Sequence, residues 1–157
     1  MQGFISGLFD RLDEDDEQAT GSKHDARTRA FDDAKRSVTR DLQALLNTRS
    51  ALSPEVLAPY PAVSGSIVNY GLIDFAGMGM NSDSDQQEIC KAVRLAIERH
   101  EPRLHKVTVT LRATKGAINR VDFVISARLK NAPSTEPISF NAAFCPSLQQ
   151  YSIEGTH

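Results

Sequence analysis

Side chains that can exchange protons or bind ions gather in one short stretch, Glu98 to Leu104, which reads Glu-Arg-His-Glu-Pro-Arg-Leu. Glu98 and Glu101 are three residues apart, so they share one face if the stretch continues a helix. Glycoside hydrolases use two such carboxyls, ~5–10 Å apart, to flank a sugar ring. The chain has no tryptophan and 6% aromatic residues, which leaves little surface for stacking sugars. Glycoside hydrolysis is therefore the alternative interpretation, and a non-enzymatic role is favoured.

No other stretch matches a catalytic or cofactor-binding pattern. Gly77-Met78-Gly79 lacks the further glycine and the lysine of a phosphate-binding loop. There is no CxxC pair and no HExxH sequence, and no serine stands in a nucleophile-elbow sequence. His100 and His105 flank a helix-to-strand junction, a geometry that does not favour convergence on one metal ion. The sequence therefore predicts no enzyme activity, no metal and no cofactor.

The charged stretch also has two non-catalytic interpretations. Pro102 disfavours helical geometry at Glu101, so a helix is predicted to end near His100. In one interpretation the stretch is a solvated helix terminus, whose surface ion pairs contribute ~0–1 kcal/mol each. In the other, Pro102 fixes the backbone so that Glu101 and Arg103 present a rigid acceptor–donor pair to a partner's carboxylate or carbonyl groups. The residue types alone leave both interpretations open.

Two helices are predicted by apolar residues at helical spacing. The first runs from about Asp25 to Arg49 and contains no glycine or proline. The second begins at a capping box formed by Ser84 and Gln87 and ends near His100. The apolar stripes are Val38, Leu42, Leu45 and Leu46 in the first helix, and Ile89, Val93 and Ile97 in the second.

Strands are predicted where apolar and polar residues alternate with period two. The alternation is clear from Val107 to Leu111, from Val121 to Leu129 and from Ile138 to Phe144, and it is weaker from Leu148 to Glu154. Ser66 to Asp74 also has the composition of a short extended segment. The predicted fold class is α+β: two main helices packed on one face of a small antiparallel β-meander, with a flexible N-terminal extension.

The first 25 residues differ from the rest of the chain. Their apolar residues share one helical face and an acidic run, residues 13–17, follows them. Helices this short are marginal in water, so we expect Phe9 and Leu12 to dock, either on the chain's own domain or in a partner's groove. We divide the chain into an amphipathic, partly disordered segment, residues 1–25, and one domain, residues 26–157.

Charge and hydropathy exclude several kinds of partner. The formal net charge of -2 gives no field that would steer the whole protein to nucleic acid or an acidic membrane. Asp10 and Arg11 interrupt the apolar start, so it is no signal peptide. No stretch reaches the ~18 apolar residues of a membrane span. We therefore expect a cytoplasmic protein with no nucleic-acid partner and no direct membrane insertion.

Three motifs carry a resemblance to a known family. Arg40 to Arg49 (RDLQALLNTR), then Ile67 to Phe75 (IVNYGLIDF), then Ile97 to Leu104 (IERHEPRL) occur in that order. Together they resemble the phage baseplate-wedge (lysozyme-like) family, over roughly Ala34 to Glu154. The sequence FDRL at residues 9–12 further resembles the bacterial branch of this family, the TssE subunits of type VI secretion baseplates.

This resemblance implies a structural role in a contractile-tail baseplate. It implies wedge partners of the TssF, TssG and TssK families, and sheath proteins TssB and TssC where the first sheath ring polymerises. The residues implied as partner-binding are Glu101, Pro102 and Arg103, together with Asn47, Thr48 and Arg49. The older lysozyme name would instead make Glu98 or Glu101 catalytic in peptidoglycan hydrolysis, which we keep as the alternative function.

The resemblance and the predicted sheet together suggest how such a subunit would act. An unprotected sheet edge invites another chain to pair with it. We expect one edge strand of the meander to accept strands from sheath subunits by β-augmentation, with Glu101 and Arg103 holding the wedge partners. The sequence does not select which strand forms the edge.

Overall fold

Four antiparallel strands form one sheet in the order β1-β2-β3-β4. The computed structural model describes residues 23–75, 82–112, 120–130, 132, 137–145, 148 and 150–155. The strands are β1 (Leu104–Arg112), β2 (Val121–Leu129), β3 (Ile138–Cys145) and β4 (Gln150–Gly155). Each pairs with the next strand of the sequence. The predicted meander is confirmed, its weak fourth segment included, and its two edges are β1 and β4.

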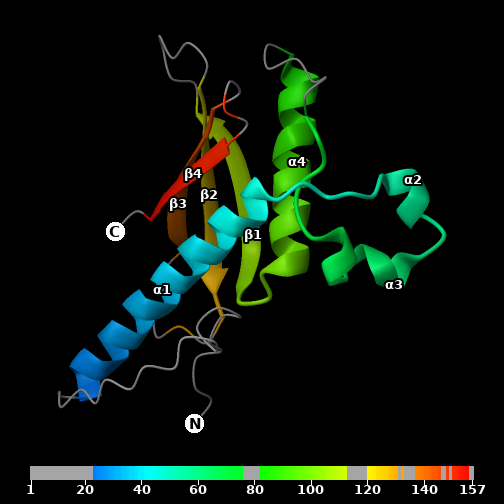
Figure 1. Ribbon diagram of the computed structural model, residues 1–157. Helices are drawn as coiled ribbons and strands as arrows, with labels where there is room; N and C mark the ends of the chain where they lie inside the picture. The colour runs from blue at the N-terminus through cyan, green and yellow to red at the C-terminus, as the bar shows by residue number, and fades with distance from the viewer. Residues whose placement is uncertain are drawn as a thin grey trace.

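Two long helices accompany the sheet, and residues 50–75, which follow the first of them, form a short helical segment that we call the excursion. The helices are α1 (Lys23–Asn47), α2 (Pro54–Leu57), α3 (Pro61–Ser64) and α4 (Asp83–His100), with a 3-10 turn, η1 (Ile67–Asn69). In Figure 1, α1 crosses the sheet beside β4, α4 runs along β1, and α2 and α3 project away from the sheet beyond α4. The α+β class is confirmed, with α1 and α4 as the two main helices.

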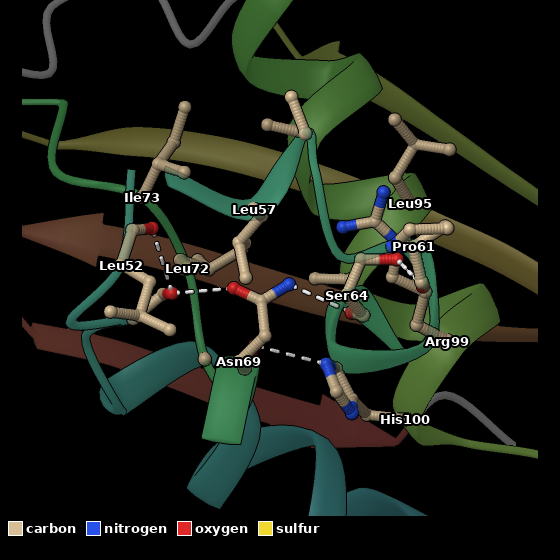
Figure 2. Close-up of a pocket in the computed structure, with 15 residues that line it drawn as sticks. Leu52, Leu57, Pro61, Ser64, Asn69, Leu72, Ile73, Leu95, Arg99 and His100 are labelled. Carbon is tan, nitrogen blue, oxygen red and sulfur yellow. Dashed lines mark hydrogen bonds between the residues drawn. The ribbon is translucent and has the colours of Figure 1, made fainter. Parts of the chain in front are cut away.

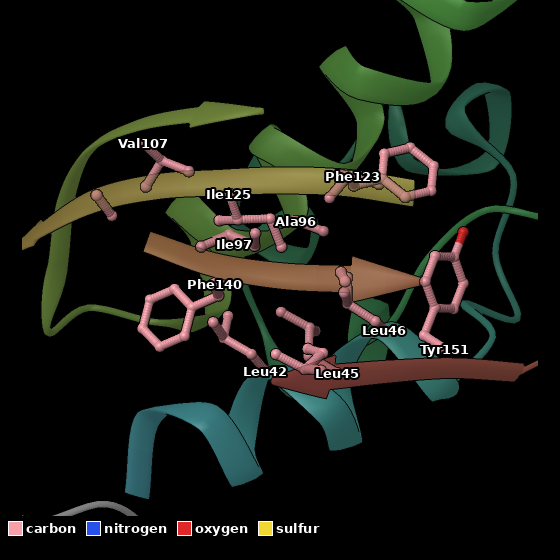
Figure 3. Close-up of a cluster of buried hydrophobic side chains, with 14 of the residues drawn as sticks. Leu42, Leu45, Leu46, Ala96, Ile97, Val107, Phe123, Ile125, Phe140 and Tyr151 are labelled. Atoms are coloured by element: carbon pink, nitrogen blue, oxygen red, sulfur yellow. The ribbon is translucent and has the colours of Figure 1, made fainter. Parts of the chain in front are cut away.

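The core lies between these two helices and one face of the sheet. Phe123 and Ile125 of β2 and Phe140 of β3 are buried there, as Figure 3 shows. They meet Leu42 of α1 and Ile97 of α4 in one cluster. Burial of each such side chain stabilises the fold by ~1.5–3 kcal/mol. The apolar stripes that predicted the two helices are therefore the faces that the helices bury.

The start of α4 differs from the predicted capping box. The N-cap is Ser82, and its side chain makes no capping hydrogen bond. Ser84 lies inside the first turn, and the hydroxyls of Ser82 and Ser84 are 2.7 Å apart. Asp83 and Asp85 occupy the first turn, where the positive end of the helix dipole favours carboxylates. The prediction that Ser84 and Gln87 form the cap is wrong by two residues.

The segment predicted as extended, Ser66 to Asp74, is mostly not a strand. The η1 turn occupies its first half, and Ser66 Oγ accepts a hydrogen bond from Val68 N–H. Its one ladder contact is an isolated parallel bridge between Leu72 and Arg49. Gly71 makes this approach possible, because its φ is +116° and a Cβ there would lie 2.5 Å from Thr48 O.

The N-terminal predictions lie outside the described residues. This applies to Phe9, to Leu12 and to the acidic run, and the division of the chain near residue 25 stays a prediction. Within the described part of the chain, no helix combines the length and the apolar composition that crossing a membrane requires.

Candidate functional site

The junction between α4 and β1 positions Glu101 and Arg103. Glu101 is the C-cap of α4, and its N–H donates to Ile97 O at 2.9 Å. Leu104 N–H donates back to Glu101 O at 3.1 Å, so Pro102 sits at the tip of a tight turn. The turn sends both flanking side chains inward: Glu101 is 4% exposed and Arg103 is 6% exposed, whereas Pro102 is exposed. The Glu-Pro-Arg element is therefore a turn with a buried charge pair behind it.

Arg103 holds two carboxylates and a hydroxyl. Its Nε and Nη2 atoms donate to Glu101 Oε1 and Oε2 at 2.7 and 2.6 Å, the bidentate geometry that suits a planar guanidinium. Nη2 also donates to Asp41 Oδ2 at 2.5 Å, and Nη1 donates to Ser37 Oγ at 2.9 Å. Asp41 and Ser37 both lie on α1. The guanidinium therefore ties α1 to the α4–β1 turn.

Burial and charge act in opposite directions on this cluster. Burial alone lowers the pKa of Arg103, but the hydrogen bonds and charges of Glu101 and Asp41 outweigh it and hold that pKa above its ordinary value. For Asp41 the balance is reversed: burial raises the pKa of its carboxyl despite the attraction of Arg103. The surrounding carboxylates thus stabilise the charged form of Arg103, whereas burial disfavours the charged form of Asp41.

The structure differs from both interpretations of this stretch. It is not a solvated helix terminus, because α1 covers the pair. It is not an open acceptor–donor pair either, because all three guanidinium nitrogens of Arg103 and both Glu101 oxygens form hydrogen bonds within the domain. A partner can contact Pro102 directly, but it reaches Glu101 or Arg103 only by displacing these bonds. Glu98, the other carboxylate of the hydrolase alternative, is exposed on α4.

The second motif, Asn47 to Arg49, lies at the C-terminal end of α1. Its contacts are separate from those of Glu101 and Arg103. Asn47 Nδ2 donates to Tyr151 O at 2.9 Å, and Tyr151 N–H donates to Asn47 Oδ1 at 2.8 Å. Thr48 O accepts from Leu72 N–H at 2.8 Å, and Arg49 forms the bridge to Leu72. The two motifs are therefore not brought into one site. They brace α1 at its middle and at its end.

An apolar pocket of ≈ 460 Å³ lies between α4 and the helical excursion. Figure 2 shows Asn69 among the residues that line it. Asn69 is 6% exposed; its Oδ1 accepts from Ser50 Oγ at 2.7 Å and its Nδ2 donates to Ser64 O at 2.8 Å. His100 Nε2 lies 3.1 Å from Asn69 O, and the His100 ring stands edge-on to Tyr70. Asn69 therefore holds the excursion against the end of α4.

Sequence reasoning missed the partners of both motifs. Ser37 and Asp41 are four residues apart on α1, each directly before a member of the apolar stripe, and that i, i+4 spacing beside a buried face was the available signal. Tyr151 carried no such signal, because Asn47 binds its backbone. Among the residues that the structure describes, no group of three histidine, cysteine or acidic side chains is placed to hold a metal ion.

Fold and site together define a small α+β domain in which one helix is pinned to a meander by a buried arginine and by a helix-terminal amide. The profile of a family described as "Baseplate wedge protein gp25" matches residues 32–134. The chain belongs to this family.

One solved structure is also similar to the chain. It is titled "The baseplate complex from the type VI secretion system", and one of its chains aligns with a TM-score of 0.48 and 17% identity. The alignment covers 85% of this chain and 98% of that one. No match was found among curated proteins.

Proposed function

We propose that this chain is a structural, non-enzymatic subunit of a type VI secretion baseplate, on the cytoplasmic side. It binds wedge partners of the TssF, TssG and TssK families and offers one sheet edge to the first ring of TssB and TssC sheath proteins. Membership of the baseplate wedge family supports this role. The observation that carries the sheath contact is the outer edge of β4, where backbone groups beyond Tyr151 have no partner among the described residues.

The pairing pattern identifies those backbone groups. The backbone N–H and C=O of Tyr151 both bond to the Asn47 side chain, so they point away from β3. Backbone direction alternates along an antiparallel strand, and the register of β3 with β4 is unbroken, so the N–H and C=O of Ile153 point the same way. Apart from the strand ladder, no described residue hydrogen-bonds to Ile153. This edge can accept a strand.

The opposite edge, β1, is less suited to pairing. Its ladder with β2 shifts register between His105 and Thr108, and Lys106 has a φ of +53°. Such a bulge bends a strand and interrupts its row of backbone groups. We therefore assign the sheath contact to β4.

We assign wedge binding to the Glu-Pro-Arg turn and the excursion. Pro102 is the exposed residue of the turn, and Glu101 and Arg103 fix its position from behind. The excursion exposes large apolar side chains, and exposed apolar residues are typical of protein–protein contacts where they form a contiguous patch. They are Val56, Tyr60, Ile67 and Val68. The motif Asn47-Thr48-Arg49 then acts by bracing the excursion and β4.

Phe9 and Leu12 provide a further proposed contact. We place the amphipathic segment, within residues 1–25, on a wedge partner, and the domain from residue 26 in the baseplate itself. Deletion of residues 1–12 should leave the melting temperature of the isolated protein unchanged and weaken its co-purification with wedge proteins. A large fall in melting temperature would instead show that the segment folds onto its own domain.

The sheath contact is tested by two substitutions at one residue. Ile153→Ala and Ile153→Pro both trim the same buried side chain, but only proline also removes the outward N–H. We expect sheath co-sedimentation with Ile153→Ala to remain near wild type and with Ile153→Pro to fall at least tenfold. Equal sheath binding by both variants would show that β4 is not the paired edge. Clearing of a peptidoglycan suspension by the wild type, abolished in Glu101→Gln, would support the hydrolase alternative instead.

A further inference from the structure

The side chain of Asn47 occupies the place of a strand residue at the edge of the sheet. In an antiparallel ladder, two residues of a hydrogen-bonded pair exchange both N–H···O bonds. Asn47 makes the same exchange with Tyr151 through its amide, which donates to Tyr151 O at 2.9 Å and accepts from Tyr151 N–H at 2.8 Å. One carboxamide therefore satisfies both outward backbone groups of Tyr151.

The amide is held in this position from the helix side. Asn47 is the last residue of α1, and its Nδ2 also donates to Gln43 O at 2.8 Å. The next residue, Thr48, bonds back to Ala44 O through its hydroxyl at 2.8 Å. A side chain anchored at both ends cannot move aside without losing three hydrogen bonds.

The outward-facing positions Tyr151 and Ile153 of β4 therefore differ. Asn47 bonds to both backbone groups of Tyr151, whereas the outward N–H and C=O of Ile153 have no hydrogen-bond partner among the residues that the structure describes. On the Gln150 side of Tyr151, away from Ile153, the edge leads into a polar recess of ≈ 430 Å³ lined by Gln43, Asn47 and Arg49, among others. A strand sliding along the edge toward this recess would meet the Asn47 amide.

We propose that Asn47 is a positioning residue that closes the β4 edge at Tyr151, so that an incoming strand pairs with β4 only from Ile153 onward. The inference rests on the proposed function, because it concerns the same edge. A fixed start of pairing would set the register of the partner strand. Register matters because a slip of one residue exchanges the two faces of a strand. A fixed stop at Tyr151 excludes the longer pairing.

The first test uses the isolated full chain and measures amide hydrogen exchange residue by residue. In the wild type, we expect the Tyr151 amide to exchange at least tenfold more slowly than the Ile153 amide, although both face outward. Asn47→Ala should remove this difference and leave the core amide of Ile125 unchanged. Gln43→Ala is the matched control, since it alters a neighbouring side chain of the same recess and keeps the Asn47 amide. Equal exchange at Tyr151 and Ile153 in the wild type would overturn the proposal.

The second test repeats the measurement on assembled baseplate–sheath complexes. With the wild type, we expect assembly to slow exchange at Ile153 and to leave Tyr151 as it was. With Asn47→Ala, assembly should slow both amides, because the pairing then extends. If Ile153 is protected in both assemblies and Tyr151 stays fast in Asn47→Ala, the stop is unnecessary and the inference fails. If assembly leaves Ile153 fast in the wild type, the edge assigned in the proposed function is wrong, and the claim about register falls with it.

Discussion

Arg103 and Asp41 lie 62 residues apart in the chain, and the guanidinium Nη2 of the first is 2.5 Å from the carboxylate Oδ2 of the second. This contact joins the middle of α1 to the turn that starts the sheet. Both groups are largely removed from water, with side chains 7% and 15% exposed. Ion pairs of this kind stabilise a fold weakly by themselves, but removal of one partner leaves a buried charge uncompensated.

Arg103→Leu should therefore be strongly destabilising. The substitution leaves the carboxylates of Glu101 and Asp41 without their cationic partner. We expect the free energy of unfolding to fall by ~3–5 kcal/mol. Urea denaturation followed by circular dichroism measures the change. The matched control is Arg120→Ala, which breaks an ion pair with Asp122 whose arginine is 62% exposed; an exposed pair of this kind contributes little to stability. Equal losses in the two variants would contradict a stabilising role for the buried cluster.

Gly71→Ala tests the close approach of the excursion to the end of α1. A Cβ at this position would lie 2.5 Å from Thr48 O, and the φ of +116° is strained for alanine. We expect a loss of ~1–3 kcal/mol in unfolding free energy. Gly65→Ala is the control, because its Cβ would meet nothing within 4 Å and its φ is −96°; we expect it to be neutral or to stabilise by up to ~1 kcal/mol. The same loss at both glycines would show that contact with Thr48 is not the cause.

His100 should make stability depend on pH. Burial lowers the pKa of His100 below its ordinary 6.5, only partly opposed by its hydrogen bond to Asn69 O, and the charge of Arg99 lowers it further. Below pH 6.5 the unfolded chain then binds more protons than the folded one. The contribution of neutral His100 to the free energy of unfolding is therefore present above pH 6.5 and is lost as pH falls through the folded-state pKa.

The measurement is the free energy of unfolding between pH 5 and 8. We expect the difference in unfolding free energy between the wild type and His100→Gln to decrease as pH falls below 6.5, by at most ~1.4 kcal/mol per pH unit. Tyr70→Phe keeps the ring that stands against His100 and should retain the wild-type slope. A difference between wild type and His100→Gln that stays constant with pH would rule out this titration.

Tyr151→Phe should be tolerated. The hydroxyl is buried and has no hydrogen-bond partner among the described residues, and burial raises the pKa of Tyr151 to about 12, although the charge of Arg49 lowers it. Removing an unsatisfied buried polar group is neutral or stabilising by up to ~1 kcal/mol. Thermal denaturation checks this, with Tyr151→Ala as the comparison, which should cost ~3–5 kcal/mol through lost packing. A large loss in Tyr151→Phe would reveal a partner for the hydroxyl.

The amino-acid sequence by itself determined the fold class, the two main helices, the four strands and the core. These features arise from local periodicity: Val38 and Leu42 recur at helical spacing, and Phe123 and Ile125 recur at strand spacing, whatever lies across from them. The end of α4 was equally local, since Pro102 acts on the residue before it. The segment from Ser66 to Asp74 was misjudged because its path depends on Gly71 approaching Thr48.

Only the tertiary structure decided what the motif residues do. Glu101 and Arg103 have the composition of an exposed charged turn, and they are buried because Ser37 and Asp41 on a distant helix receive the guanidinium. Asn47 closes a sheet edge because α1 ends where β4 passes. Burial and hydrogen-bond partners are properties of pairs of segments far apart in the chain, and no spacing within one segment encodes them. For the same reason, the proposed choice of β4 over β1 as the paired edge rests on the register shift of β1 and the unbroken register of β4 with β3, which only the folded chain shows.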